Sequence, residues 1–225
     1  MQRVSEHSHT LSRAVRIEPR WPVAVAIIAV LVLLHALPAR LWLFPKWASY
    51  VAAIGCLVPM TAVSLTAGHA RWLRVERIIM EVFFVLTLAS ALALLRALIL
   101  AMIYGSGISG LQLLTSSVAV WVINVVAFSL LYWQIDRGGP EARLHHTHPV
   151  PDFLFVQAGT SGDLTAWRPT FVDYLFLGYS TATAFSATDV APLTGRAKLL
   201  MMLESAIALA TIVVVASRAI NILGG

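Results

Sequence analysis

The sequence predicts an all-α fold: a polytopic membrane helix bundle of about five transmembrane helices plus one re-entrant half-helix. Two observations predict it. Hydrophobic residues make up 59% of the chain and charged residues only 12%, which leaves too little polar surface to cover a soluble domain. The apolar residues also form runs that approach or exceed the roughly 20 residues that a helix needs to cross the hydrocarbon core. We therefore expect the lipid bilayer to be the solvent.

A polar N-terminal arm, residues 1–20, precedes a four-helix membrane region over residues 21–135. The first apolar run follows this arm without the pattern of a cleavage site, so we expect a signal anchor rather than a removed signal peptide. Aromatic residues at the ends of several runs are typical of interfacial anchors. The four predicted helices are Trp21 to Leu37, Ala48 to Ala67, Ile78 to Tyr104 and Leu113 to Trp133.

The second half of the chain begins with a polar linker loop, residues 136–170, which is rich in Gly, Pro and His. The apolar stretch from Phe171 to Phe185 follows, too short to span a membrane but long enough for a helix that enters and stops. The last transmembrane helix is predicted from Ala197 to Leu223. Irregular backbone at membrane depth is tolerated only inside protein or beside a wet cavity, so residues 171–225 form the candidate functional region.

Cationic residues predict the orientation of the chain. The positive-inside rule places segments rich in Arg and Lys in the cytoplasm. Alternating the predicted spans puts twelve cationic residues inside, three outside (Arg40, Lys46 and Arg218) and Arg96 within a span. We expect an inside N-terminus, a cytoplasmic linker and an outside C-terminus, in a bacterial inner membrane. The twelve inside residues are Arg3, Arg13, Arg16, Arg20, Arg71, Arg74, Arg77, Arg137, Arg143, Arg168, Arg196 and Lys198.

The stretch from Tyr179 to Thr194 matches a known pattern. It reads YSTATAFSATDVAPLT and falls without a gap on the sequence ending in TVGYGD-x-x-P-x-T of two-transmembrane-type potassium channels. Residues 171–223 therefore resemble the pore helix, filter and inner helix of that family. The whole chain also resembles a group of bacterial integral membrane proteins of similar length that have no assigned activity. The matching positions are Thr181, Thr183, Asp189, Pro192 and Thr194, and Gly195, Arg196 and Glu204 also look like family residues.

The resemblance implies a pore loop with a degenerate filter. A potassium filter uses two Gly residues at positive φ, and Ser186 and Thr188 stand in their places at a cost of roughly 1–2 kcal/mol each. We expect a homotetramer that passes monovalent cations without ordinary potassium selectivity. The alternative is a non-conducting membrane protein that keeps the pore-loop fold as a structural or partner-binding element. The filter-equivalent residues are Thr183, Ala184, Phe185, Ser186, Ala187, Thr188 and Asp189.

The resemblance and the cationic residues disagree about the side of the membrane from which the loop enters. A potassium-channel loop enters from outside, whereas the cationic residues place this one on the cytoplasmic side. Three explanations stay open: one predicted span is itself re-entrant, the loop is inverted as in glutamate-receptor-type channels, or the resemblance is an architectural remnant.

Two charged residues are predicted to support the pore from within the membrane. Arg96 lies in the third predicted helix, where an ionised group costs at least roughly 2.5 kcal/mol unless it is paired or solvated. Glu204 in the last helix and Glu81 in the third are candidate carboxylate partners, with Asn124 as a neutral contact. Such a group is either part of an ion or proton relay or one half of a pair that fixes helix packing.

Other chemistry is not expected. Ser and Thr are plentiful, but we find no nucleophile with a base at usable spacing, so we expect no enzyme and no cofactor. The imidazoles of His145, His146 and His148, with Asp152 nearby, match no defined metal site and are expected to be solvated. Cys56 is the one cysteine, which excludes an internal disulfide. The net charge of +5 reflects residues that flank membrane helices rather than nucleic-acid binding.

Overall fold

The computed structural model describes residues 20–37, 45–65, 70–104, 109–145, 150–160, 167–183 and 190–223. These residues are mostly helical, which confirms the predicted all-α class. A short two-stranded antiparallel sheet was not predicted. The elements are α2 (Trp21–Ala36), α3 (Lys46–Leu65), α4 (Ala70–Tyr104), α5 (Gly110–Ile135), the 3₁₀ turn η2 (Asp136–Gly138), α6 (Pro140–His145), β1 (Phe153–Phe155), α7 (Val156–Thr160), α8 (Phe171–Ala182), β2 (Val190–Pro192) and α9 (Gly195–Leu223).

Three of the described helices are long and apolar enough to cross a membrane, over Arg74–Leu100, Gly110–Gly138 and Gly195–Ser217. They coincide with the third, fourth and last predicted membrane helices. Two shorter apolar helices, Trp21–Ala36 and Tyr50–Ala62, fall within the first two predicted runs. The structure is thus compatible with a membrane protein, and the count of five spans stays a prediction.

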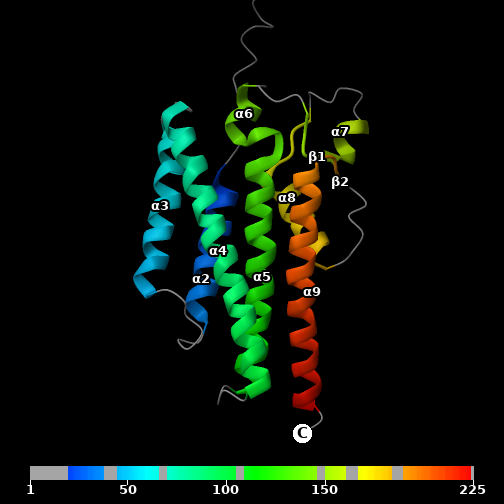
Figure 1. The fold of residues 1–225 in the computed structure, drawn as a ribbon. Coiled ribbons are helices and arrows are strands. Elements are labelled where there is room, and N and C mark those ends of the chain that lie inside the picture. The colour runs from blue at the N-terminus through cyan, green and yellow to red at the C-terminus, as the bar shows by residue number, and fades with distance from the viewer. Residues whose placement is uncertain are drawn as a thin grey trace, which may run out of the picture.

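Helix α5 is the centre of the bundle and packs against α2, α4, α8 and α9. It lies between α4 and α9 in Figure 1. Its residues from Ile123 to Gln134 are buried without interruption, so this half of the helix is enclosed on every side. An apolar helix that is buried all round belongs to the interior of a larger bundle.

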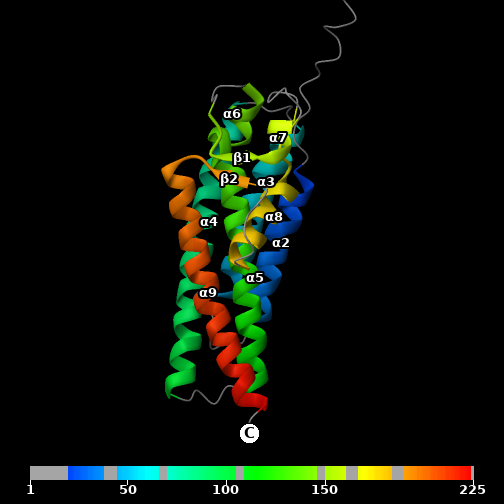
Figure 2. The ribbon, with the colours of Figure 1, turned by 90° about the vertical axis from the view of Figure 1, so that its right-hand side faces the viewer.

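The bundle has one end that carries the sheet. Helices α2, α4 and α9 begin there, α5 ends there, and α6, α7, β1 and β2 gather there (Figures 1 and 2). The register pairs Phe153 with Pro192 and Phe155 with Val190. We call this end the sheet end. A buried ion pair between Arg20 and Glu76 joins the start of α2 to α4 at this end, with an N–O distance of 2.9 Å.

A capping box defines the start of α5, and a turn with positive φ angles follows its end. At its start Ser109 and Gln112 form a reciprocal capping box, which satisfies two otherwise unpaired N–H groups. At its other end Arg137, Gly138 and Gly139 have φ values of 53°, 79° and 94°. A side chain at Gly139 would also lie 2.7 Å from the carbonyl oxygen of Gln134, so only glycine fits this turn.

The predicted linker over residues 136–170 contains regular structure in its described parts. The turn η2 leads into α6, and β1 and α7 follow. Phe153 and Phe155 of β1 are buried and belong to the main hydrophobic core. This segment therefore packs on the sheet end of the bundle and brings β1 beside the start of α9.

Candidate functional site

Helix α8 is the half-helix of the candidate region. Its 12 residues span about 18 Å at roughly 1.5 Å per residue, less than the roughly 30 Å of a hydrocarbon core. It follows Pro169, and at its start the backbone N–H and hydroxyl of Thr170 donate to Asp173 Oδ2 at 2.6 and 2.8 Å. The helix packs mainly against α5 and also against α9 and α2. It extends from the sheet end into the bundle (Figures 1 and 2).

The chain on both sides of α8 is held at the sheet end. Strand β1 precedes α8 in the sequence and β2 follows it, yet the two strands pair with each other. The chain therefore enters the bundle as α8 and is back at the same end by Val190. Whether this segment enters a membrane as a re-entrant half-helix stays a prediction from the sequence.

Asp136, at the end of α5, binds both sides of this segment. Its carboxylate is fully buried. Oδ1 accepts the backbone N–H groups of Asp152 and Phe153 at 2.8 and 3.2 Å, and Oδ2 accepts the hydroxyl of Tyr174 at 2.6 Å. One side chain thus joins α5, the start of β1 and the first turns of α8. The guanidinium of Arg143 lies 5.8 Å from the Tyr174 ring centroid.

A second carboxylate, Asp152, fixes the start of α9. Arg196 donates Nε to Oδ1 at 2.6 Å and Nη2 to Oδ2 at 2.5 Å, and the hydroxyl of Thr194 donates to Oδ1 at 2.6 Å. Burial alone would raise the pKa of Asp152, but the hydrogen bonds from Arg196 and Thr194 outweigh it and lower that pKa below its ordinary value. The bidentate pair locks β1 to the residues that follow β2.

Helices α5, α8 and α9 approach closely at Gly178. A Cβ atom there would overlap Ser129 Oγ, and it would lie 3.1 Å from the carbonyl oxygen of Val125 and 3.3 Å from Glu204 Oε1. The hydroxyl of Ser129 is already engaged, because it donates to the Val125 carbonyl at 2.7 Å. Small residues at such crossings let helix backbones approach inside a membrane. Gly178 therefore sets the depth at which α8 seats between its neighbours.

Glu204 is buried in the same place. Its side chain has no exposed surface, and Oε2 accepts the hydroxyl of Tyr132 at 2.5 Å. Asn124 donates to the backbone carbonyl of Glu204 at 3.3 Å. Glu204 Oε1 is buried and has no hydrogen-bond partner among the described residues. The carboxyl group thus faces α5 and α8, enclosed by protein.

Arg96 lies far from this cluster. It follows Glu76 by 20 residues along α4, a rise of about 30 Å from the sheet end. Its side chain is exposed, and none of the ion pairs within the described residues includes it. Of its candidate partners, Glu81 pairs with Arg77 at 3.4 Å and Glu204 contacts Tyr132. An Arg four residues from the end of a span can extend its guanidinium toward the interface.

The filter-equivalent residues are described only in part. Thr183 follows the last residue of α8 as its C-cap, and its hydroxyl donates to the carbonyls of Tyr179 and Ser180 at 2.8 and 3.3 Å. The other predicted filter residues, 184–189, lie outside the described residues. Ser205 of α9 donates to the carbonyl of Thr181 at 3.3 Å, so α9 also holds the far end of α8.

The candidate metal ligands are not brought together within the described ranges. His146 and His148 lie outside those ranges, and no group of three His, Cys, Asp or Glu side chains suited to a metal ion occurs among the described residues. Asp152 is instead engaged by Arg196 and Thr194.

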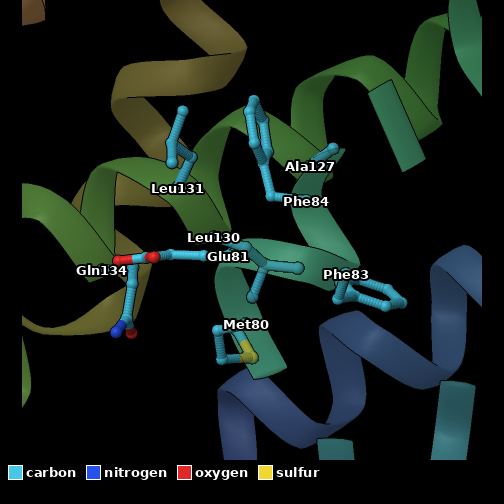
Figure 3. A pocket seen from close by; sticks show the side chains of 8 residues that line it. All are labelled: Met80, Glu81, Phe83, Phe84, Ala127, Leu130, Leu131 and Gln134. Atoms are coloured by element: carbon cyan, nitrogen blue, oxygen red, sulfur yellow. The ribbon is translucent and has the colours of Figure 1, made fainter. Parts of the chain in front are cut away.

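A small hollow lies between α4 and α5, and all of its lining residues come from these two helices (Figure 3). Its lining is almost entirely apolar, with residues such as Phe84 and Leu131, and its polar members are Glu81 and Gln134. Gln134 Oε1 is buried and finds no hydrogen-bond partner in the part of the chain that the structure describes. The hollow shares no residue with the cluster around Glu204.

Sequence reasoning missed the residues that hold α8 in place. Asp136, Tyr132 and Tyr174 were not singled out, although a Tyr inside an apolar run needs a partner for its hydroxyl. Gly178, a lone Gly in a short apolar helix, was likewise a signal of close backbone approach. Thr194, Arg196 and Glu204, which the resemblance did single out, all make polar contacts here.

No family model, curated protein or solved structure matches the chain in the comparisons made. The resemblance to potassium channels therefore stays a prediction from the residues that carry it.

Proposed function

We propose that this chain is a multi-pass protein of a bacterial inner membrane whose α8 and following loop form the pore loop of a cation-permeable homotetramer. Five helices cross the membrane in this proposal, α2 and α3 included. The observation that carries it is the pairing of β1 with β2, which returns the chain to the sheet end on both sides of a half-helix. A segment that enters and leaves on one side is how membrane proteins build filters.

The distribution of charge supports a cytoplasmic sheet end. Described cationic residues gather where α2, α4 and α9 begin and where α5 ends, whereas the far end has few. By the positive-inside rule the loop then enters from the cytoplasm, as in the inverted arrangement. The residues at the sheet end are Arg20, Arg74, Arg77, Arg137, Arg143, Arg168, Arg196 and Lys198.

The outer surface of α9 supports contact with lipid or with other copies of the chain. Its exposed large side chains recur at helical spacing along one face. An exposed apolar stripe of this length is disfavoured in water but suits a bilayer or a subunit interface. The residues are Leu199, Met202, Leu203, Leu209, Ile212 and Val213.

One observation favours a non-conducting alternative. The polar groups that flank α8 are engaged in fixing it, since Asp136 binds Tyr174 and Glu204 is enclosed by α5 and α8 rather than presented on an open face. In this alternative the pore-loop fold is a structural or partner-binding element without ion flow.

Flux through the purified protein in liposomes decides between the two. We would measure potassium, sodium and proton flux at several membrane potentials, for the wild type, Asp189→Ala and the control Glu81→Gln. Glu81 is an exposed carboxylate outside the loop, so Glu81→Gln removes one negative charge, as Asp189→Ala does, but at a site away from the proposed pore. The pore proposal expects flux that Asp189→Ala changes severalfold and Glu81→Gln leaves unchanged. Correctly inserted protein that is silent at every potential would instead support the non-conducting alternative.

A further inference from the structure

Glu204 is an ionisable group placed inside a membrane-spanning helix, and none of the described ion pairs includes it. It lies within the apolar span Gly195–Ser217 and has no exposed surface. The ion pairs formed among the described residues are Arg20 with Glu76, Arg77 with Glu81 and Arg196 with Asp152, so none reaches Glu204. An ionisable group in this setting is a functional candidate by default.

The surroundings of Glu204 supply one titratable contact. From α5, Tyr132 donates to Oε2. From α8, Asp173 accepts from Thr170 and Tyr174 donates to Asp136, while Tyr179 is exposed beside Trp121. From α4, Arg96 is exposed and Glu81 pairs with Arg77. Strand β2 contributes only Val190, Ala191 and Pro192.

The two carboxyl oxygens of Glu204 differ in what they contact. Oε2 is occupied by the Tyr132 hydroxyl. Oε1 is buried without a partner among the described residues and faces the place where Gly178 lacks a side chain, beside the Ser129 hydroxyl and the Val125 carbonyl. These two α5 oxygens are acceptors, and an ionised carboxylate offers them no proton. A proton on Oε1 would turn the Glu204 carboxylate into a hydrogen-bond donor on the side that faces the Ser129 hydroxyl and the Val125 carbonyl.

We propose that Glu204 is an internal proton-binding site, which takes up one proton on Oε1 while Tyr132 stays hydrogen-bonded to Oε2. Hydronium gives its proton to Oε1 and leaves as water, and the new O–H group points toward Ser129 and the Val125 carbonyl. Protonation would thereby neutralise the buried carboxylate at the point where α8 packs between α5 and α9. The site goes beyond the proposed pore, because it exists in a conducting or a non-conducting protein alike.

Infrared spectroscopy of the full-length protein in liposomes at neutral pH tests the site. A protonated carboxyl group has a C=O stretching band well separated from the bands of ionised carboxylates. We expect such a band in the wild type, its loss in Glu204→Gln and its retention in the control Glu81→Gln. Tyr132→Phe should move it to higher wavenumber, because the C=O group at Oε2 then loses its donor.

Absence of the band, or a band that survives Glu204→Gln, overturns the proposal. Should Glu204→Gln fail to fold, as judged from the helical amide band, wild-type protein labelled with ¹³C-glutamate replaces it. The label must then shift the band to lower wavenumber, and Tyr132→Phe must shift it upward. If the ¹³C label or Tyr132→Phe does not shift the band, the band belongs to another residue, and the proposal is overturned as well.

Discussion

The hydroxyl of Tyr174 donates to Asp136 Oδ2 at 2.6 Å, and this contact joins the half-helix α8 to the end of the central helix α5. Both side chains are completely buried. Their positions differ by 38 residues in the sequence, so the contact forms only when α8 has seated against the bundle.

Tyr174→Phe should lower stability by about 1–3 kcal/mol, because it leaves a buried oxygen of Asp136 without its donor. The thermal unfolding midpoint in a mild detergent measures the loss. Tyr179→Phe is the matched control, since Tyr179 lies on the same helix with an exposed side chain. Equal effects of the two substitutions would contradict the role given to the Asp136 contact.

Gly178→Ala should destabilise the protein by about 1–3 kcal/mol, because the new methyl group would overlap Ser129 Oγ and press on the Val125 carbonyl. Adding Ser129→Ala removes the closest of these contacts and should recover part of the loss. Gly55→Ala is the control: nothing lies within 4 Å of a Cβ there, and alanine favours a helix. Equal changes in the unfolding midpoint for Gly178→Ala and Gly55→Ala would refute close packing at Gly178.

Because Asp152 pairs with Arg196, we expect the stability of the protein to fall as the pH is lowered into the acid range. Its hydrogen bonds hold the folded-state pKa of Asp152 below the ordinary value of about 3.9. A carboxyl group with a lowered folded-state pKa stabilises the protein above its unfolded-state pKa, and that contribution disappears as the pH falls through the folded-state value.

Asp152→Asn should therefore lower the unfolding midpoint at pH 7, and the gap to the wild type should narrow once the pH falls below about 4. Glu81→Gln, which breaks an exposed pair on α4, should change stability by no more than about 0.5 kcal/mol at either pH. A gap that is the same at pH 7 and in acid would show that the Asp152 charge contributes nothing.

The helices were predictable because length and hydropathy decide them. Apolar runs of some 20 residues coincide with α4, α5 and α9, and the shorter run after Thr170 marks the start of α8. The predicted half-helix ran to Phe185, whereas α8 ends at Ala182, and helix ends depend on local hydrogen bonds such as those of Thr183.

The contacts of the site could not be predicted in the same way. Strands of three residues leave no alternating pattern to recognise, so β1 and β2 were invisible in the sequence. Asp136 was part of a segment that composition described as a linker, and the partners of its carboxylate lie 16 to 38 residues away. Such pairings follow from tertiary packing, which no local periodicity encodes.

The central claim is that α8 enters and leaves the membrane on one side, and the sidedness of single cysteines tests it most directly. In a Cys56→Ser background, Val150→Cys lies before β1, Leu193→Cys lies after β2, and Ile103→Cys marks the far end of α4. All three native side chains are exposed. Each variant is labelled with a membrane-impermeant maleimide in intact and in permeabilised spheroplasts. We predict that the cysteines introduced at positions 150 and 193 react only after permeabilisation and that the one at position 103 reacts in intact cells. Opposite sidedness of positions 150 and 193 would mean that the chain between them crosses the membrane, which would contradict the account.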